Sequence, residues 1–480
     1  MNDRKGFGSN FGFLMAAVGS AVGLGNIWGF PNKMGANGGF PFLILYLALA
    51  LCCGVIIMLG ELALGRKTGH GAVGAYQSIS KRFKWLGWLG IAAAALIFSF
   101  YSALGGYCLR YVVVNFGNLI GAEFGTNGVG GAGVFQGLLS QPDVSIAFAL
   151  AFMLITMLVV MSGVGGGIER VCSVGMPALF FILIICIIRS CTLPGAADGL
   201  KYMFVPGWAV ANGIIDEAPG FWRVLTAAGG QMFFSLSLGA GVMITYGSYL
   251  DKKQDLGKSA MIIVGMDTVV ALMAGLCVIP GRFALDPNGA LGGPELLFIT
   301  MQNVFDKMGP AGPVFGILFY LLVFFAAISS SISMLEVIVA HFCDKAREKG
   351  KGDRRKLYSA IAVVICAALC ALVCADGMGS NHISPAELLG LAGAKLPGWS
   401  TSWLGLFDSV AEGLLMPLGA LLMCLMISWE LKPDTLRQEI LLNGENRPWV
   451  YDFFRLCVKY ITPLCMLMIL YGQISDFFIV

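Results

Sequence analysis

Residues 19–26 read GSAVGLGN, and they fall in the middle of the first apolar run of the chain, from about residue 11 to residue 33. A second stretch rich in glycine and serine, GGQMFFSLSLGAG at residues 229–241, interrupts the sixth apolar run in the same way. Small residues spaced like Gly19-x-x-x-Gly23 also occur where membrane helices pack closely, so one such stretch alone favours packing. Two interruptions five spans apart are instead typical of transporters built from two inverted repeats, which bind their substrate where the two broken helices meet.

The composition indicates a membrane protein. Of the 480 residues, 57% are apolar and 12% are charged, whereas a soluble domain carries about 25% charged residues. Apolar runs of roughly 20 residues, the length that crosses a bilayer core, recur along the whole chain. We expect eleven spans, at about residues 11–33, 40–65, 86–116, 144–163, 170–192, 222–250, 256–283, 310–344, 356–377, 403–431 and 451–479.

The basic residues predict the orientation. With the N-terminus in the cytoplasm, the six inner segments contain 21 of the 31 Lys and Arg residues, and seven of these lie between Lys345 and Lys356. The positive-inside rule therefore places the N-terminus in the cytoplasm and the C-terminus outside. We expect a multi-pass protein of a bacterial inner membrane. The outer connections, around residues 117–143, 193–221, 284–309 and 378–402, are long and carry few basic residues.

Other classes of protein find little support. The 14 cysteines mostly lie inside apolar runs, where they act as small buried hydrophobes rather than as a disulfide framework. An intramembrane enzyme would need paired carboxylates, an HExxH motif or a Ser/His pair at mid-depth, and the sequence has none of these. A sensor would need a soluble output domain, and no inner loop is long enough to form one. We expect no enzymatic activity and no binding to nucleic acid.

Three motifs carry a family resemblance. GSAVGLGNIW at residues 19–28 with Phe30-Pro31, GQMFFSLSLG at residues 230–239 and FAAISSS at residues 325–331 resemble, in this order, the signatures of the neurotransmitter:sodium symporter family. The resemblance covers essentially the whole chain, and eleven spans are typical of the bacterial branch. It implies an all-α polytopic membrane protein with a LeuT-like 5+5 inverted repeat. Residues 1–192 would form the first repeat (spans 1–5), residues 193–431 the second (spans 6–10) and residues 432–480 the eleventh span.

The function that this resemblance implies is sodium-coupled symport of an amino acid by alternating access. An unwound helix offers carbonyl groups to a cation and N–H groups to a carboxylate at a depth without water. The substrate carboxylate would meet the amides of Gly23, Leu24 and Gly25 and the hydroxyl of Tyr101. The expected partners are thus the amino acid and the lipid bilayer. The oligomeric state is unknown from the sequence.

Na+ would be the coupling ion, and two sites are implied by the resemblance. The first would use the Ala21 carbonyl, Asn26, Ser235 and Asp267. The substrate carboxylate would complete this site, so Ala21 and Ser235 also belong to the substrate site. The second site would use the carbonyls of Gly19, Val22 and Ala326 with the hydroxyls of Ser329 and Ser330.

Asp267 lies about midway along an otherwise apolar seventh span, where a carboxylate is costly and functional by default. Related chains often carry asparagine here, and chloride-dependent relatives place an anion nearby. We therefore hypothesise that Asp267 supplies a fixed negative charge and makes transport independent of chloride. After sodium leaves, burial would favour the protonated form and allow proton counter-transport. The alternative function is a proton-coupled amino-acid transporter of the same fold, with Asp267 as its proton site.

The resemblance also implies a side-chain pocket, lined by Ile97, Phe234, Ser237, Ala240, Ser330 and Met334. Gly23 stands where monoamine carriers place an aspartate, which favours an α-amino acid as substrate. Ala240 stands where a phenylalanine narrows the pocket of a related carrier. The pocket should therefore accept a neutral, hydrophobic or aromatic L-amino acid.

The outer gate departs from the family pattern. Gly29 occupies the position of the usual gating arginine, whereas Asp408 keeps the acidic position. The outer gate would then rest either on Tyr101 and Phe234 or on another cation, such as Lys33 or Arg223. Gln231 would line the vestibule.

The inner gate keeps more of the pattern. Arg4 matches the gating arginine, with Asp344 as its partner and with Ser248 and Tyr249 completing the set, while Phe7 replaces the usual tryptophan. Gly167 and Pro177 match a Gly-x9-Pro hinge in span 5. Proline supplies no N–H, so the preceding turn is weakly held and can unwind.

Overall fold

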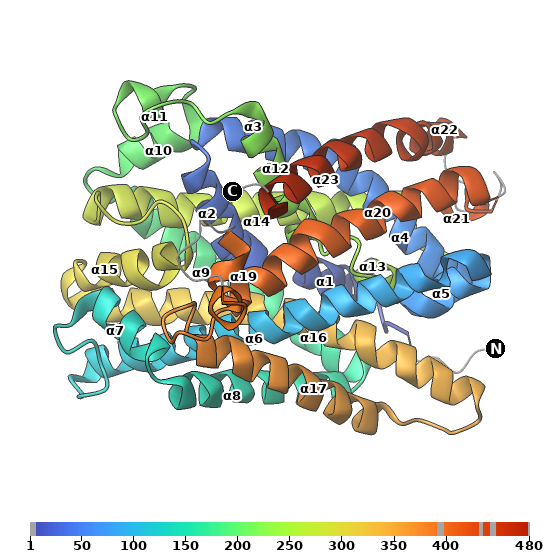
Figure 1. The fold of residues 1–480 in the computed structure, drawn as a ribbon, viewed down its shortest axis with the longest axis horizontal. Helices are drawn as coiled ribbons and strands as arrows, with labels where there is room; N and C mark the ends of the chain where they lie inside the picture. The colour runs from blue at the N-terminus through green and yellow to red at the C-terminus, as the bar shows by residue number, and fades with distance from the viewer. Residues whose placement is uncertain (1–5, 391–397, 432–434, 442–447, 479–480) are drawn as a thin grey trace.

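The helices are arranged side by side around the broken first span. The computed structural model describes residues 6–390, 398–431, 435–441 and 448–478, and within these ranges it contains helices and turns but no β-strand. Short helices gather at one end of the bundle (Figure 1), which we name the outer end after the predicted orientation. They include α7 (Gly130–Leu139), α10 (Ala196–Phe204), α11 (Trp208–Ala211) and α15 (Met301–Asp306). The opposite, inner end holds α5 (Ala72–Ile79) and α21 (Arg437–Ile440).

Nine helical segments of the described residues are long and apolar enough to cross a membrane. They correspond to the predicted spans 2–5 and 7–11. In chain order they are α3, η2 and α4 (Phe40–Leu49, Ala50–Gly54, Val55–Thr68), η3 and α6 (Lys81–Phe83, Lys84–Ile120), α8 (Pro142–Met161), η4 and α9 (Val164–Ile168, Glu169–Cys191), α14 (Leu256–Leu285), η6 and α16 (Gly309–Ala311, Gly312–Glu348), α17 (Arg355–Asp376), α19, η8, α20 and η9 (Trp403–Asp408, Ser409–Leu415, Met416–Leu425, Met426–Glu430), and α22, η11 and α23 (Pro448–Leu456, Cys457–Ile461, Thr462–Phe478).

The two remaining spans are the broken ones. α1 (Asn10–Ala21) and the helix formed by η1 and α2 (Gly25–Gly29, Phe30–Ala36) meet at an angle of 43° and make one bent span. α12 (Phe221–Leu236) and α13 (Val242–Gly247) flank residues 237–241, and each is too short to cross a bilayer core alone. With the first pair, the described residues contain up to ten apolar segments that could cross a membrane, and α12 and α13 lie where the sequence predicts the sixth of eleven spans. The repeat boundaries at residues 192 and 431 stay a prediction.

The backbone explains why these helices stop. Val22 leaves the helical region, with φ −74° and ψ 95°. Ser237, Gly239 and Gly241 all have positive φ, at 52°, 78° and 74°. The left-handed region suits glycine but costs other residues about 1–2 kcal/mol. Ser237 adopts this conformation nevertheless. There its hydroxyl donates a 3.1 Å hydrogen bond to the carbonyl of Ser20, next to the first break.

A buried carboxylate from span 2 supports the second break. Glu61 in α4 is 1% exposed, and its Oε1 accepts a 2.6 Å hydrogen bond from the N–H of Gly239. A helix break leaves N–H groups without intrahelical partners, and inside a membrane they need a substitute. Glu61 thus stabilises the unwound conformation of span 6. This residue was not among the predicted ones, although a carboxylate in the apolar second span was a visible signal.

Candidate functional site

A carboxylate from span 7 lies between the two breaks. Asp267 in α14 is fully buried, and its Oδ1 accepts hydrogen bonds from Asn26 Nδ2 at 2.7 Å and Ser235 Oγ at 2.9 Å. Its Oδ2 accepts from the hydroxyl of Tyr46 in α3 at 3.1 Å. The predicted first-site side chains Asn26, Ser235 and Asp267 are therefore in direct contact. Tyr46 was missed, because a tyrosine near the start of an apolar run gives no signal of such a contact.

The residues of the predicted second ion site also come together. Ser329 Oγ in α16 lies 3.4 Å from the carbonyl oxygen of Val22 and 3.0 Å from that of Ala326. Ser330 Oγ lies 3.4 Å from the carbonyl oxygen of Gly19 and 3.1 Å from that of Ser20. All five predicted ligands thus meet where α1 ends against α16. Ser20 was not among the predictions.

The donor chemistry of both clusters fits an alkali cation. The predicted ligands are carboxylate, amide, hydroxyl and carbonyl oxygens, which hard cations prefer. Two of these carbonyls, those of Gly19 and Val22, belong to the end of α1, where the helix leaves carbonyls without intrahelical N–H partners. A cation at either cluster would have an all-oxygen surrounding away from water.

The backbone at the first break is arranged to donate hydrogen bonds. The N–H of Leu24 donates to the hydroxyl oxygen of Tyr101 at 2.7 Å, and the N–H of Gly23 donates to Asn26 Oδ1 at 3.0 Å. A Cβ added at Gly23 would lie 2.2 Å from Ser330 Oγ and 2.5 Å from the Tyr101 hydroxyl oxygen. Gly23 therefore has to be glycine for these groups to approach one another. A small anion at this place would find amide and phenol donors within reach.

The predicted pocket residues are all buried. Phe234, Ser237 and Ser330 lie at the two breaks, and the Phe234 ring centroid is 6.3 Å from that of Tyr101. Ala240 also lies in the second break, Ala21 and Gly25 flank the first, and Ile97 and Met334 are buried on α6 and α16. A Cβ added at Gly25 would lie 3.1 Å from both the Phe234 ring and Ser235 Cα, so the two broken helices touch closely here.

Known proteins share this organisation. The family model described as the sodium:neurotransmitter symporter family matches residues 4–126 and 133–478. The chain belongs to this family. It is therefore a sodium-dependent membrane transporter and not an enzyme.

Individual members of the family align over most of the chain. The uncharacterised sodium-dependent transporter YhdH of Bacillus subtilis is 36% identical, over 97% of this chain and 97% of its own length. The uncharacterised sodium-dependent transporter MJ1319 of Methanocaldococcus jannaschii is 30% identical, over 91% and 84% of the two chains. A crystal structure of MhsT in complex with L-phenylalanine matches with a TM-score of 0.83 and 34% identity, over 98% of this chain and 100% of that one. The LeuT-like fold expected from the sequence is thus confirmed.

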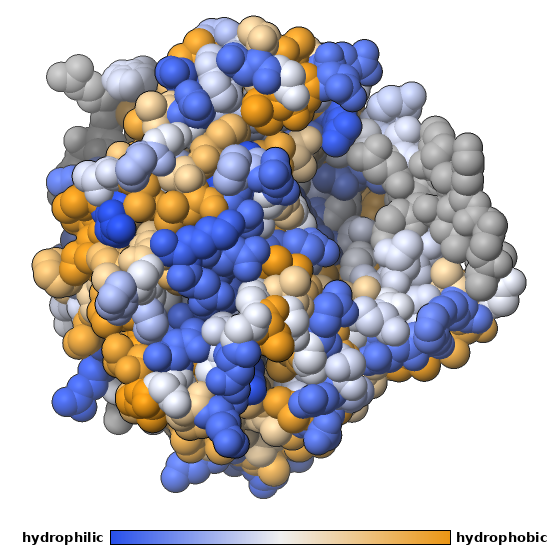
Figure 2. Space-filling model, turned by 90° about the vertical axis from the view of Figure 1, so that its left-hand side faces the viewer, coloured by the Kyte–Doolittle hydropathy of each residue, from blue (hydrophilic) through white to orange (hydrophobic). Residues whose placement is uncertain are grey.

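The outer side of this symporter has an ion pair that the sequence only partly predicted. Lys33 in α2 forms a salt bridge with Glu412 in η8, four residues after Asp408. Both acidic residues line a cavity of about 290 Å³ together with Lys33, Asn37, Arg223 and Gln473. The surface of the outer end is hollowed and bordered by hydrophilic residues (Figure 2). Of the two predicted cations, Lys33 makes the pair, whereas Arg223 donates to the carbonyl of Ala36 at 3.2 Å.

Gly29 explains why the usual pairing is absent from this symporter. A Cβ at this position would lie 2.9 Å from Gln231 Oε1, and that oxygen is buried without a hydrogen-bond partner. The Nε2 atom of Gln231 donates to the carbonyl of Gly25 at 2.6 Å. Gln231 therefore braces the start of the outer half of span 1; it is fully buried and is not among the residues that line the cavity at the outer end.

The inner end contains a second ion pair, which the sequence analysis missed. Glu336 in α16 pairs with Arg355 in α17 at 2.5 Å and also accepts a 2.6 Å hydrogen bond from the Tyr249 hydroxyl. The predicted gate residue Asp344 accepts from the N–H of Gly71 at 3.1 Å, and Ser248 Oγ donates to the carbonyl of Thr245 at 2.6 Å. Arg4 lies outside the described residues. The predicted Arg4–Asp344 contact therefore stays a prediction.

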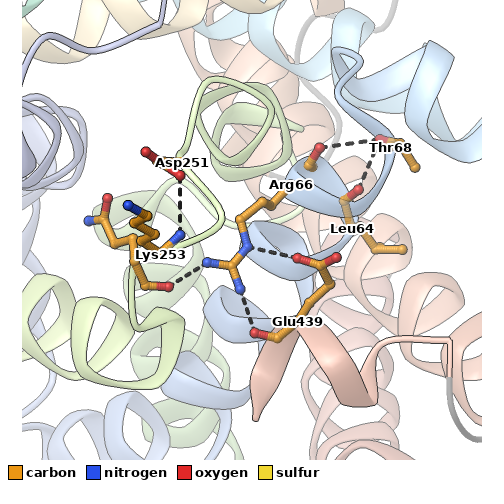
Figure 3. A network of polar contacts seen from close by, with 8 residues as sticks. Leu64, Arg66, Thr68, Asp251, Lys253 and Glu439 are labelled. Atoms are coloured by element: carbon orange, nitrogen blue, oxygen red, sulfur yellow. Dashed lines mark hydrogen bonds and ion pairs between the residues drawn. The ribbon is translucent and has the colours of Figure 1, made fainter. Parts of the chain in front are cut away.

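Further polar contacts tie the inner loops together. Arg66, near the inner end of α4, donates from Nε to Glu439 Oε2 at 2.8 Å and also bonds the carbonyls of Glu439 and Gln254 (Figure 3). Gln254 in turn donates to Asn10 Oδ1 at 2.6 Å. Arg66 thus links span 2 to the segments that precede spans 7 and 11.

The predicted hinge lies beside the second ion site. α9 contains Pro177, and Gly167 sits in the preceding π-helical turn η4, where a Cβ would lie 2.1 Å from the carbonyl oxygen of Val159. Side chains of the same helix, Cys172 and Met176, come within 3.4 Å of a Cβ placed at Gly19. An opening of α9 would therefore remove the two side chains that cover Gly19, one of the predicted ligands of the second site.

Proposed function

We propose that this transporter couples sodium to the uptake of a neutral, hydrophobic or aromatic L-amino acid by alternating access. The observation that carries the proposal is the contact of Asp267 with Asn26 and Ser235, next to the donor groups of Gly23 and Leu24. A cation held by the carboxylate and an anion held by the N–H groups would lie side by side. Direct attraction between the two would couple the ion to the substrate.

The substrate class rests on three features. The donors at the first break suit a carboxylate, because N–H groups at a helix start attract anions. No acidic side chain stands at position 23, where an amine without a carboxylate would need one. Finally, the related transporter MhsT binds L-phenylalanine, and Ala240 is smaller than the phenylalanine that narrows the pocket of a related carrier.

Two sodium ions per cycle are proposed, one at each oxygen cluster, and Asp267 would replace chloride as the balancing charge. Asp267 is the one carboxylate in contact with the predicted first site among the described residues. Transport would be directed into the cytoplasm of a bacterium, with the Lys33–Glu412 pair on the outside. A proton-coupled carrier of the same fold is the second candidate, favoured by the complete burial of Asp267.

The test is a thermal-shift screen of the full chain with the twenty amino acids, each in sodium chloride, sodium gluconate and potassium chloride. We expect stabilisation by one or a few hydrophobic or aromatic amino acids, in both sodium salts and not in potassium. Uptake into proteoliposomes under a sodium gradient or a pH gradient then separates the two candidates. Uptake driven by the pH gradient in the absence of sodium would replace the sodium symporter with the proton-coupled carrier.

A further inference from the structure

The inner end of span 1 is bound by a carboxylate from span 5. Glu169 is the first residue of α9, and its Oε2 accepts a 2.7 Å hydrogen bond from the N–H of Gly8. Its Oε1 accepts a 2.9 Å hydrogen bond from Ser9 Oγ. Ser9 is the N-cap of α1, and its Oγ accepts a 2.9 Å hydrogen bond from the N–H of Gly12. The carboxylate, the serine and the helix start therefore form one continuous chain of hydrogen bonds.

The neighbouring glycines fit this contact. A Cβ added at Gly12 would lie 1.8 Å from Glu169 Oε1, so only glycine lets the carboxylate reach Ser9. On the other side, a Cβ at Gly6 would lie 2.6 Å from the carbonyl oxygen of Tyr249. The segment from Gly6 to Gly12 is thus confined between the end of span 6 and the start of span 5. A negative charge at a helix N-terminus is also favourable, since it opposes the helix dipole.

An aromatic cluster completes the closure next to this contact. The Phe7 ring packs edge-on against Phe13, Tyr246 and Tyr249, with centroid distances of 5.5, 5.6 and 6.1 Å. Rings packed in this way bury apolar surface and prefer the edge-on geometry seen here. They contact the side chain of Phe7, whereas the two hydrogen bonds of Glu169 hold the N-terminus of α1 through the backbone of Gly8 and the N-cap Ser9.

The position of Glu169 in the chain indicates how its contact with span 1 would respond to a movement of α1 or α9. It follows η4 directly, the turn that contains Gly167, and it precedes Pro177 by two helical turns. Unwinding of this region would carry the carboxylate away from Gly8 and Ser9. Conversely, an outward swing of α1 would pull on the first turn of α9.

We propose that Glu169 is a positioning residue that latches the inner end of span 1 to span 5, so that span 1 is released and span 5 unwinds in one step. The proposal rests on the alternating-access function described above and adds the residue that couples its two inner movements. With the latch formed, the cytoplasmic path to the second ion site is closed. With the latch broken, both helices that cover this site are free to move.

Cys172 offers a native reporter for the test. It is 1% exposed, and its Sγ faces Gly19, since a Cβ there would lie 3.2 Å away. It becomes accessible when α1 and α9 separate. The experiment measures its alkylation by N-ethylmaleimide in the full-length protein, by mass spectrometry of the peptide, in sodium chloride at fixed temperature.

We expect Glu169→Gln to raise the alkylation rate of Cys172 by about tenfold, because hydrogen bonds to a charged acceptor shift an equilibrium by this order. Gly12→Ala should act alike, since its methyl group displaces the carboxylate without altering Glu169. Ser9→Ala should raise the rate less, Ser9→Thr should stay near the wild type, and Ser9→Ala should add little to Glu169→Gln. Arg170→Gln, an exposed change in the same turn, is the control.

Wild-type alkylation rates in both Glu169→Gln and Gly12→Ala would overturn the proposal, even if these variants melted at a lower temperature. Equal rates in Ser9→Ala and Ser9→Thr would overturn it as well. The proposed function is tested separately with the wild-type protein alone. Its Cys172 should be alkylated more slowly in sodium chloride than in potassium chloride. A wild type indifferent to sodium would remove the proposed function, while the comparison of the variants would still decide on Glu169.

Discussion

The hydroxyl of Tyr46 donates a 3.1 Å hydrogen bond to Asp267 Oδ2, whereas Asn26 donates to the other oxygen, Oδ1. Spans 1, 2 and 6 each contribute one side chain to this single carboxylate, through Asn26, Tyr46 and Ser235. The negative charge is therefore fixed in place by three parts of the chain. Several consequences of this arrangement and of the gates can be measured.

The substitution Asp267→Asn should lower the apparent sodium affinity by about tenfold or more in chloride-free buffer, because it removes a negative charge whose attraction for a cation ~4 Å away is worth about 4 kcal/mol at an effective dielectric constant of ~20. Chloride should restore part of the loss by replacing the missing charge. The measurement is uptake at graded sodium concentrations in chloride and in gluconate. Asp306→Asn, at the outer end, is the control. Unchanged uptake without a chloride requirement would remove this role from Asp267.

The substitution Ser329→Ala should weaken sodium binding at the second site by about tenfold, while the affinity for the amino acid at saturating sodium stays within a factor of two to three. The matched control is Ser331→Ala, since Ser331 Oγ lies 2.8 Å from Thr156 Oγ1 and bonds the Ile328 carbonyl instead. Both variants are titrated with sodium by intrinsic fluorescence. The same sodium curve for the two variants would contradict the assignment.

The substitution Tyr101→Phe should raise the KM for the amino acid about three- to tenfold, because one neutral hydrogen bond contributes ~0.5–1.5 kcal/mol. Its ring still packs against Phe234, so the melting temperature should change little. Tyr107→Phe, on the same helix, is the control, since its ring contacts Phe298 at 5.8 Å. An equal effect of both substitutions on KM would mean that Tyr101 only packs.

The pocket volume can be tested with Ala240→Phe. A phenylalanine at this buried position should shift the preference from aromatic amino acids toward smaller ones such as alanine or glycine, since an added ring overfills a packed site. Competition of all twenty amino acids against one labelled substrate gives the selectivity. A preserved aromatic preference would place the side chain of the substrate elsewhere.

The Lys33–Glu412 pair should slow the release of substrate toward the outside. Lys33→Met and Glu412→Gln each leave a partly buried charge without its partner, which costs ~3–5 kcal/mol when burial is complete and less here, because Lys33 is 24% exposed. Each should therefore speed the dissociation of labelled substrate severalfold. The exchanged pair, Lys33→Glu with Glu412→Lys, should recover part of the retention. An exchanged pair worse than either single variant would assign the residues independent roles.

The sequence predicted the architecture well, because its signals are strong and local. Glycine and serine at residues 19–26 and 229–241 mark the breaks, and eleven apolar runs mark the spans. The predicted side-chain ligands also meet, since Asn26, Ser235 and Asp267 are polar residues in apolar surroundings that have to find one another.

The sequence could not predict which polar side chains pair between different helices. Glu412 was not predicted, because the family pattern places the acidic gate residue at Asp408, one helical turn earlier. In the structure, Lys33 pairs with Glu412. Glu169 looked like an ordinary charge near a helix end, and its partners Gly8 and Ser9 lie 161 and 160 residues away in the chain. Glu336 lies inside the eighth apolar run, and its partner Arg355 belongs to the next helix. Such contacts depend on how the helices pack, which local patterns do not contain.

The hydrogen bond between Ser237 and Ser20 has a further consequence for the two broken helices. A hydroxyl in a strained backbone conformation on one broken helix is bonded to the main chain of the other. If span 6 regained helical geometry there, the Ser237 hydroxyl would no longer donate to the Ser20 carbonyl, which would keep only the hydrogen bond from Ser330. The two interruptions are thus mutually dependent, and a disturbance that regularises either of them is felt at the opposite half of the molecule without any ion or substrate in between.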